Sequence, residues 1–185
     1  WTAENLRVGH FRNGDAIPRV RTNFMWKRKG AKGKPAWCHY GNDPAQEIPY
    51  GKLYNWFAVA DPRRLCPEGW HVPTNEEVQA LIDCLGGDWL LAYYRLISIR
   101  AEPDPHPRWN TRSDKATDES GFSGLPGGER FEDGTFSNIG YVGRWWSSRV
   151  QDGTVCASSL YLGMGTLGVE TNRSRQGFSV RCVKD

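Results

Sequence analysis

The clearest periodic pattern lies between residues 74 and 87 and predicts an amphipathic helix. Thr74-Asn75-Glu76-Glu77 has the form of a capping box, in which the Thr74 hydroxyl and the Glu77 carboxylate accept hydrogen bonds from backbone amides at the helix start. Apolar residues then recur at the spacing of one helix face, at Val78, Leu81, Ile82 and Leu85. Gly86-Gly87 ends the pattern, because glycine readily adopts the backbone conformation that follows a helix.

A second helix is predicted from about Tyr50 to Ala60. Its polar side would carry Lys52 and Asn55, and Asp61-Pro62 would end it, because the residue before a proline avoids the helical conformation. Its apolar side would carry Leu53, Tyr54, Trp56, Phe57 and Ala60.

From Gly121 onward the pattern changes to short apolar or aromatic segments separated by turn residues, which is typical of β-strands. Asp133-Gly134 predicts a tight hairpin, and residues 101–120, rich in proline and charge, predict a long loop. Strands are predicted at Ser158–Leu162, Thr166–Glu170 and Phe178–Val183. The sequence therefore predicts one α+β domain over residues 1–185, with two helices, antiparallel strands and much irregular loop.

Two adjacent tryptophans, Trp145 and Trp146, precede the first of these strands. Neighbouring residues on a strand point to opposite faces. We therefore expect one indole in the core and the other near the surface, as an aromatic platform beside a binding surface. The alternative, that loops cover both rings, stays open.

Composition narrows the class of protein. Only 38% of the 185 residues are hydrophobic but 12% are aromatic, so a few large rings must supply much of the core. No segment approaches the roughly 18 consecutive apolar residues of a membrane-spanning helix. A collagen, a coiled coil and an integral membrane protein are excluded.

The net charge of +3 hides a local excess of basic residues. The segment from Arg19 to Lys34 holds seven basic residues and no acidic one. With Phe24 and Trp26 nearby, this cluster of basic residues is a pattern found in surfaces that bind nucleic acids. Gly30, Gly33 and Pro35 favour a solvated loop instead, because they would break a helix, and we expect no nucleic-acid partner.

The sequence predicts no cofactor, no metal site and no catalytic residue. The five cysteines form no C-x-x-C pair, and the four histidines are scattered. Gly163–Gly168 matches G-x-G-x-x-G, but no helical pattern follows it, so we interpret it as a glycine-rich hairpin rather than a nucleotide site. Because five is odd, at least one thiol is free or pairs with another chain.

Six sequence blocks follow one another across nearly the whole chain: Trp1–Leu6, Tyr50–Trp56, Cys66–Thr74, Gly121–Gly128, Trp145–Ser148 and Gly177–Asp185. In this order they resemble the Fibrobacter succinogenes major paralogous domain. The resemblance implies a C-type-lectin-like fold of the formylglycine-generating-enzyme type. It also implies a secreted or surface-exposed bacterial protein, attached to a membrane only through an anchor outside this chain.

The resemblance also implies roles for the cysteines. Enzymes of this fold use a reactive cysteine pair in their C-terminal half, and here Cys156 has no matching neighbour, so we expect no enzyme activity. Cys182 lies in the closing block, which is structural in the fold. We expect it to form a disulfide with Cys66.

The same fold is that of the variable proteins of diversity-generating retroelements, and the segment similar to their hypervariable region is 144–176. Alternation along the strands, with Leu160 and Leu162 facing inward, predicts that six residues face a ligand: Ser159, Tyr161, Gly163, Thr166, Gly168 and Glu170. The loop before these strands is expected to add Arg149, Val150, Gln151, Asp152 and Thr154. Trp146, Arg173 and Arg175 complete the expected site.

These expectations combine into a ligand-binding display module. Its partner would be a protein or glycan on another cell or particle, and its location extracellular, on the bacterial surface or on a phage particle. The alternative is a structural subunit of a pilus or envelope assembly, in which segment 144–176 would be buried. The oligomeric state stays open.

Overall fold

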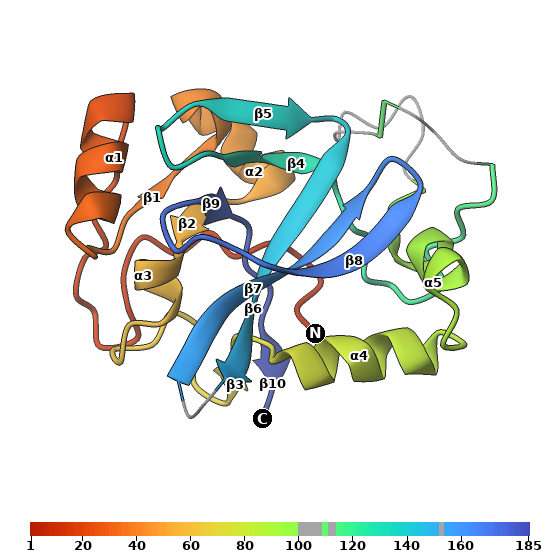
Figure 1. Ribbon diagram of the computed structural model, residues 1–185. Helices are drawn as coiled ribbons and strands as arrows, with labels where there is room; N and C mark the ends of the chain where they lie inside the picture. The colour runs from red at the N-terminus through yellow and green to blue at the C-terminus, as the bar shows by residue number, and fades with distance from the viewer. Residues whose placement is uncertain (100–108, 111–113, 152–153) are drawn as a thin grey trace.

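A computed structural model of the chain describes residues 1–99, 109–110, 114–151 and 154–185. Within these residues the chain forms five α-helices and two short 3-10 turns (Tyr40–Asn42 and Pro44–Gln46) (Figure 1). The helices are α1 (Asn23–Ala31), α2 (Glu47–Tyr50), α3 (Trp56–Val59), α4 (Asn75–Cys84) and α5 (Trp89–Leu96). The predicted helix at 74–87 is α4, and its capping box is present as expected.

The strands form three antiparallel sheets. The first is ordered β1-β2-β9-β4-β5, the second pairs β10 with β3, and the third is ordered β6-β7-β8. The first sheet contains β1 (Trp37–Cys38), β2 (Leu53–Asn55), β9 (Gly177–Phe178), β4 (Gly127–Arg130) and β5 (Phe136–Ile139). The others contain β10 (Val183–Lys184), β3 (Trp70–His71), β6 (Val142–Gln151), β7 (Thr154–Gly163) and β8 (Thr166–Thr171). The α+β class with antiparallel strands is confirmed.

Most strand predictions in the second half are confirmed. Asp133-Gly134 lies in the turn between β4 and β5, and the predicted strands at 158–162 and 166–170 lie within β7 and β8. The predicted strand at 178–183 is wrong as one element. It is divided into β9 and β10, because the chain leaves the first sheet after Phe178, contacts β6 at Ser179, and then pairs with β3. The predicted loop at 101–120 lies largely outside the described residues, and its described part contains neither helix nor strand.

The helix predicted from Tyr50 to Ala60 is wrong. Leu53–Asn55 forms β2, and only Trp56–Val59 forms a single helical turn. All three β2 residues are buried, because β2 lies between β1 and β9 and is covered on both faces. A segment buried on every side carries no one-sided apolar stripe, so its periodicity does not distinguish helix from strand.

The loop predicted around 19–34 is also wrong, because residues 23–31 form α1. The Thr22 hydroxyl accepts a hydrogen bond from the Met25 amide and caps this helix. Gly30 lies near the end of this helix, where the Arg175 side chain packs against it. A Cβ at this position would lie only 3.1 Å from that side chain, so glycine permits the close contact. Helix α5, with Asp88 as its N-cap, was not predicted.

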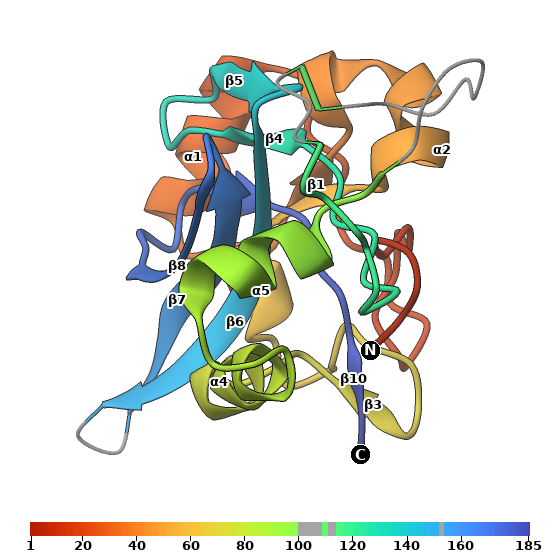
Figure 2. The ribbon, with the colours of Figure 1, turned by 90° about the vertical axis from the view of Figure 1, so that its right-hand side faces the viewer.

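Both indoles of the Trp145-Trp146 pair are fully buried, which corrects the expectation that one lies near the surface. Trp146 packs in a core with Trp56 and Phe178, and Trp145 packs on the other side of β6 with Phe122 and the apolar residues of α4 and α5. Figure 2 shows α4 and α5 lying against the β6-β7-β8 sheet. Strand β6 therefore separates two hydrophobic cores.

The two chain ends meet at one edge of the domain (Figure 1). The Thr2 amide donates a hydrogen bond to the Cys182 carbonyl over 2.9 Å, and Cys182 is joined to Cys66 in the expected disulfide. This bond connects the last segment of the chain to the loop that precedes β3. It thus fixes the final strand to the first half of the domain.

Replacing Cys66 and Cys182 together by serine should lower the free energy of unfolding by about 4–5 kcal/mol, because the disulfide closes a loop of more than 100 residues in the unfolded chain. Denaturant unfolding of both proteins measures this difference. Cys84→Ser, at an exposed cysteine outside any disulfide, is the control and should leave the free energy of unfolding unchanged. Equal stability of the double variant and the wild type would contradict the prediction.

His71 predicts a pH dependence of stability. Its Nδ1 lies 2.6 Å from Asp185 Oδ1 and its Nε2 lies 2.8 Å from Glu77 Oε1. The hydrogen bond to Asp185, together with Glu77, raises the pKa of His71 above its ordinary value of 6.5 against the effect of partial burial. The stabilisation is therefore complete below 6.5 and is lost as the pH rises through the raised pKa.

We expect the stability advantage of the wild type over His71→Gln to shrink by up to about 1 kcal/mol between about pH 6 and about pH 8, since the pair is solvent-accessible. Chemical denaturation at a series of pH values measures it. His10→Gln removes an exposed imidazole that has no carboxylate partner among the described residues, and it should leave the profile unchanged. An advantage that grows with pH would refute the assignment.

Candidate functional site

Strand pairing brings the predicted ligand-contacting residues of β7 and β8 onto one face of the third sheet. Ser159 lies opposite Glu170, Tyr161 opposite Gly168, and Gly163 opposite Thr166. Directly opposed residues of antiparallel strands share a face, and Arg144 of β6 is opposite Tyr161. We call this surface the Arg144 face and define it by Arg144, Tyr161, Thr166, Gly168, Glu170 and Asn172.

Burial divides the predicted residues. Thr166, Glu170, Arg173 and Arg175 are exposed, and Tyr161 and Gly168 are half-buried. Trp146, Ser159 and Gly163 are buried, so their predicted contact with a ligand is corrected. Trp146 fills a core and Ser159 lies beneath the side chain of Asn172, while a Cβ at Gly163 would lie 2.9 Å from the Tyr141 carbonyl oxygen.

The residues toward the tip of the β6-β7 hairpin lie apart from the Arg144 face. Arg149 was expected on a loop, but it lies in β6 opposite Cys156, half-buried on the face that Trp145 and Leu160 share, so it is not part of the Arg144 face. Its Nη1 donates a hydrogen bond to the Thr171 hydroxyl over 3.3 Å. Val150 and Gln151 end β6 and Thr154 begins β7, and Asp152 lies outside the described residues.

Arg144 is the centre of the Arg144 face. Its Nη1 donates hydrogen bonds to Glu170 Oε2 over 2.8 Å and to Asn172 Oδ1 over 3.1 Å. Its Nε lies 3.2 Å from Glu129 Oε2 in an ion pair. The guanidinium also stacks between two rings, 4.8 Å from the centre of Tyr161 and 5.3 Å from that of Phe178. Charge pairing and stacking together fix its orientation.

Side-chain amides extend this network on both sides. Asn138 Nδ2 donates to Glu129 Oε1 over 2.7 Å, so the buried Glu129 carboxylate has two polar partners. Asn172 Nδ2 donates to the Ser159 hydroxyl over 2.7 Å and to the Glu170 carbonyl over 2.8 Å. The network joins β4, β5, β6, β7 and β8, so it ties the first sheet to the third.

Sequence reasoning did not find Glu129 and Asn138, because they belong to another sheet and lie outside segment 144–176. Arg144 and Asn172 lie within that segment but were not selected. A signal for Arg144 was present: it precedes Trp146 by two residues and therefore shares its face of the strand. No local signal indicates that Glu129 would meet it, because that contact depends on the crossing of two sheets.

Arg173 and Arg175 follow β8 and lie beside α1 and the β4-β5 turn rather than over the Arg144 face. Arg173 Nη1 lies 2.6 Å from Glu132 Oε1 in an exposed ion pair. The Arg175 side chain packs on Gly30, and its carbonyl accepts a hydrogen bond from Trp26 Nε1 over 3.0 Å. Arg175 is therefore partly a packing residue, whereas Arg173 lies at the rim of the candidate surface.

The site offers polar groups for binding. A carboxylate, a hydroxyl, a phenol and a guanidinium edge lie together, and they can donate and accept hydrogen bonds with a polar ligand. Within the described residues no group of three or more His, Cys, Asp or Glu side chains could hold a metal ion. Among the described helices, none is long and apolar enough to cross a bilayer.

Comparisons with known proteins add the family. No curated protein and no solved structure matches the chain. The model of the Fibrobacter succinogenes major domain matches residues 1–184, which is nearly the whole sequence and includes all six blocks noted above apart from the final residue. The chain therefore belongs to the Fibrobacter succinogenes major domain family.

Proposed function

We propose that this protein is a non-enzymatic binding module that presents its Arg144 face to a protein or glycan on another cell or particle. One observation carries the proposal. Polar side chains of β8 point to solvent on one face of a sheet whose other face is buried against α4 and α5. An exposed polar surface on a rigid support is the arrangement that recognition sites use.

The support beneath this face is held in place before any ligand binds. Arg144 is bound on three sides by Glu129, Glu170 and Asn172 and is stacked between two rings. Preorganised side chains lose little conformational entropy on binding. The half-buried Tyr161 ring adds a rigid amphipathic contact of the kind common in antibody combining sites.

The exposed positions can change without disturbing the core. A Cβ added at Gly168 would meet no atom within 4 Å, and the Thr166 side chain is exposed. Tolerance of substitution at a binding face is what a variable protein of a diversity-generating retroelement needs. This tolerance and the six blocks support our proposal of a C-type-lectin-like fold with a diversified face in segment 144–176.

An extracellular or cell-surface location, or a phage particle, belongs to the same proposal. The Cys66–Cys182 disulfide supports it, because disulfides are typical of oxidising compartments outside the cytosol. One further observation supports the expected absence of enzyme activity: burial raises the pKa of Cys38 to about 11, which disfavours a reactive thiolate.

A structural subunit is the second candidate, and the position of β8 favours it. Within the described residues β8 pairs only with β7, so its outer edge can accept a strand from another chain. Sedimentation velocity at increasing concentration tests this candidate: a self-assembling subunit forms ordered oligomers, whereas a display module does not need them.

The binding proposal predicts that substitutions on and beside the Arg144 face weaken ligand binding. A screen of the purified domain against glycan and cell-surface protein arrays should give a ligand. Thr166→Ala/Glu170→Ala/Arg173→Ala should weaken binding of that ligand by about tenfold or more, because interface anchors commonly contribute over about 1 kcal/mol. Gly168→Tyr should also block it, since the added ring occupies the face without entering the core.

The matched control is Gln79→Ala/Glu68→Ala/Lys184→Ala, which removes three exposed polar side chains elsewhere. It should bind like the wild type, as should Cys156→Ser. Thermal unfolding of every variant confirms that the fold persists. Binding that survives both changes to the Arg144 face, or that disappears in the control, would move the ligand site to another surface.

A further inference from the structure

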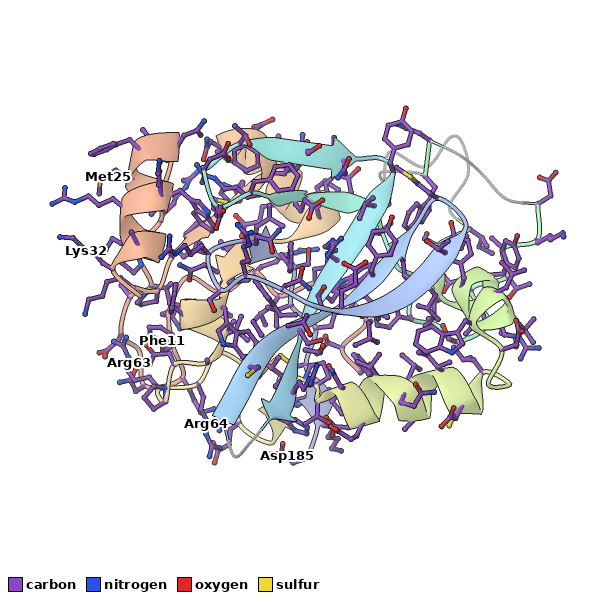
Figure 3. All side chains as sticks on the ribbon, in the orientation of Figure 1. Phe11, Met25, Lys32, Arg63, Arg64 and Asp185 are labelled. Carbon is purple, nitrogen blue, oxygen red and sulfur yellow. A yellow bond between two sulfur atoms is a disulfide. The ribbon has the colours of Figure 1, made fainter. Side chains whose placement is uncertain are left out.

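A second surface, at the opposite edge of the molecule from α5, has a strongly basic character. Helix α1, at the left of Figure 1, and the residues after it carry Lys27, Arg28, Lys29, Lys32 and Lys34. Among the residues that the structure describes, Arg28, Lys29, Lys32 and Lys34 have no acidic partner. Figure 3 shows Met25 and Lys32 directed outward from this edge.

The acidic residues nearest the basic edge are already paired. Asp15 and Asp61 both bind Arg63, whose Nη1 lies 2.9 Å from Asp15 Oδ2 and whose Nη2 lies 2.8 Å from Asp61 Oδ2. Asp133 accepts two hydrogen bonds from Thr135. None of these carboxylates balances Lys29 or Lys34, so the edge keeps its positive charge.

Two hollows run along this edge and share Lys29 and Lys34. The larger, of about 520 Å³, lies between the end of α1 and the segment after α3. Its walls include Phe57, the ion pair of Asp61 and Arg63, and three prolines: Pro18, Pro35 and Pro62. The smaller, of about 260 Å³, is lined by Met25, Arg28, Lys29, Lys32 and Lys34. We call the two together the basic groove.

The charges of the basic groove repel one another. Arg28 and Lys32 are four residues apart at the end of α1, a spacing at which like charges destabilise a helix. The negative end of the helix dipole offsets part of this repulsion, because Arg28 and Lys29 lie in the last turn of α1 and Lys32 is its C-cap. A polyanion in the groove would relieve the remaining repulsion.

The shape of the groove selects among polyanions. A flat bilayer cannot enter hollows, although Phe24 is exposed nearby. The Cys66–Cys182 disulfide is typical of proteins outside the cytosol, where nucleic acids are not the usual partner. Apolar walls of proline and phenylalanine suit the faces of sugar rings, and lysine ammonium groups on the rim suit carboxylate or sulfate groups.

We propose that the basic groove binds an acidic polysaccharide chain, with Lys29 and Lys34 contacting its anionic groups where the two hollows meet. This site is independent of the Arg144 face. It would hold the domain on a polyanionic matrix while the other face recognises its own ligand.

Calorimetric titration with size-defined heparin oligosaccharides and with polygalacturonate tests the proposal. Both should bind at low salt and bind more weakly at high salt, because surface ion pairs are screened. Lys29→Gln/Lys34→Gln should lower the affinity about tenfold, because two of the cations that attract the polyanion are lost.

The control, Arg64→Gln/Lys184→Gln, removes the same charge from exposed positions outside the groove and should bind like the wild type; Figure 3 shows Arg64 well away from Met25 and Lys32. Thr166→Ala/Glu170→Ala/Arg173→Ala should also retain polysaccharide binding, which separates this site from the Arg144 face. Equal binding of neutral dextran, or undiminished binding by the lysine variant, would overturn the proposal. Binding only to single-stranded DNA or to phosphatidylglycerol vesicles, or to no probe, would overturn it as well.

Discussion

The structure depends on the burial of two adjacent tryptophans on opposite faces of β6. Trp145 donates a hydrogen bond from Nε1 to Asn5 Oδ1 over 2.7 Å, and Trp146 donates from Nε1 to the Tyr54 carbonyl over 2.6 Å. Each indole therefore anchors its core to a segment far away in the sequence. A strand with a large ring on each face can neither slip in register nor rotate, because either change would expose one ring and leave a buried polar group unpaired.

The Arg144 face follows from this constraint. Because Trp146 fixes β6, Arg144 two residues earlier is placed on the same face and meets Glu129 of the first sheet. The buried Arg181 supports the same junction from the chain's last segment: its Nε donates to Asn5 Oδ1 over 3.0 Å, the atom that Trp145 also uses. The surface proposed for binding thus lies on a sheet whose first strand is fixed by both cores, while its outermost side chains take little part in the packing.

The two proposed surfaces differ in physical character. On the Arg144 face each charged side chain has a partner of opposite sign, since the Arg144 guanidinium meets both the Glu129 and the Glu170 carboxylates, so recognition there would depend on shape and hydrogen bonds. The lysines of the basic groove have no acidic partner among the described residues, so attraction there would be long-range and sensitive to salt. One domain can therefore combine selective binding with attachment to a charged matrix.

The sequence by itself determined the elements that depend on residues close together in the chain. The capping box of α4, the Asp133-Gly134 hairpin and the alternation in β7 and β8 could be predicted, and the resemblance to a family supplied the Cys66–Cys182 pairing. Tertiary structure decided the rest. Residues 53–55 formed β2 because Leu53 and Tyr54 are buried in separate cores on opposite faces of the strand, and Gly30 is accommodated in α1 because Arg175 packs on it. Trp146 and Ser159 were withdrawn from the surface by contacts with Phe178 and Asn172. Alternation along a strand specifies which residues share a face, but only the packing of sheets and loops against that face decides which of them reach solvent.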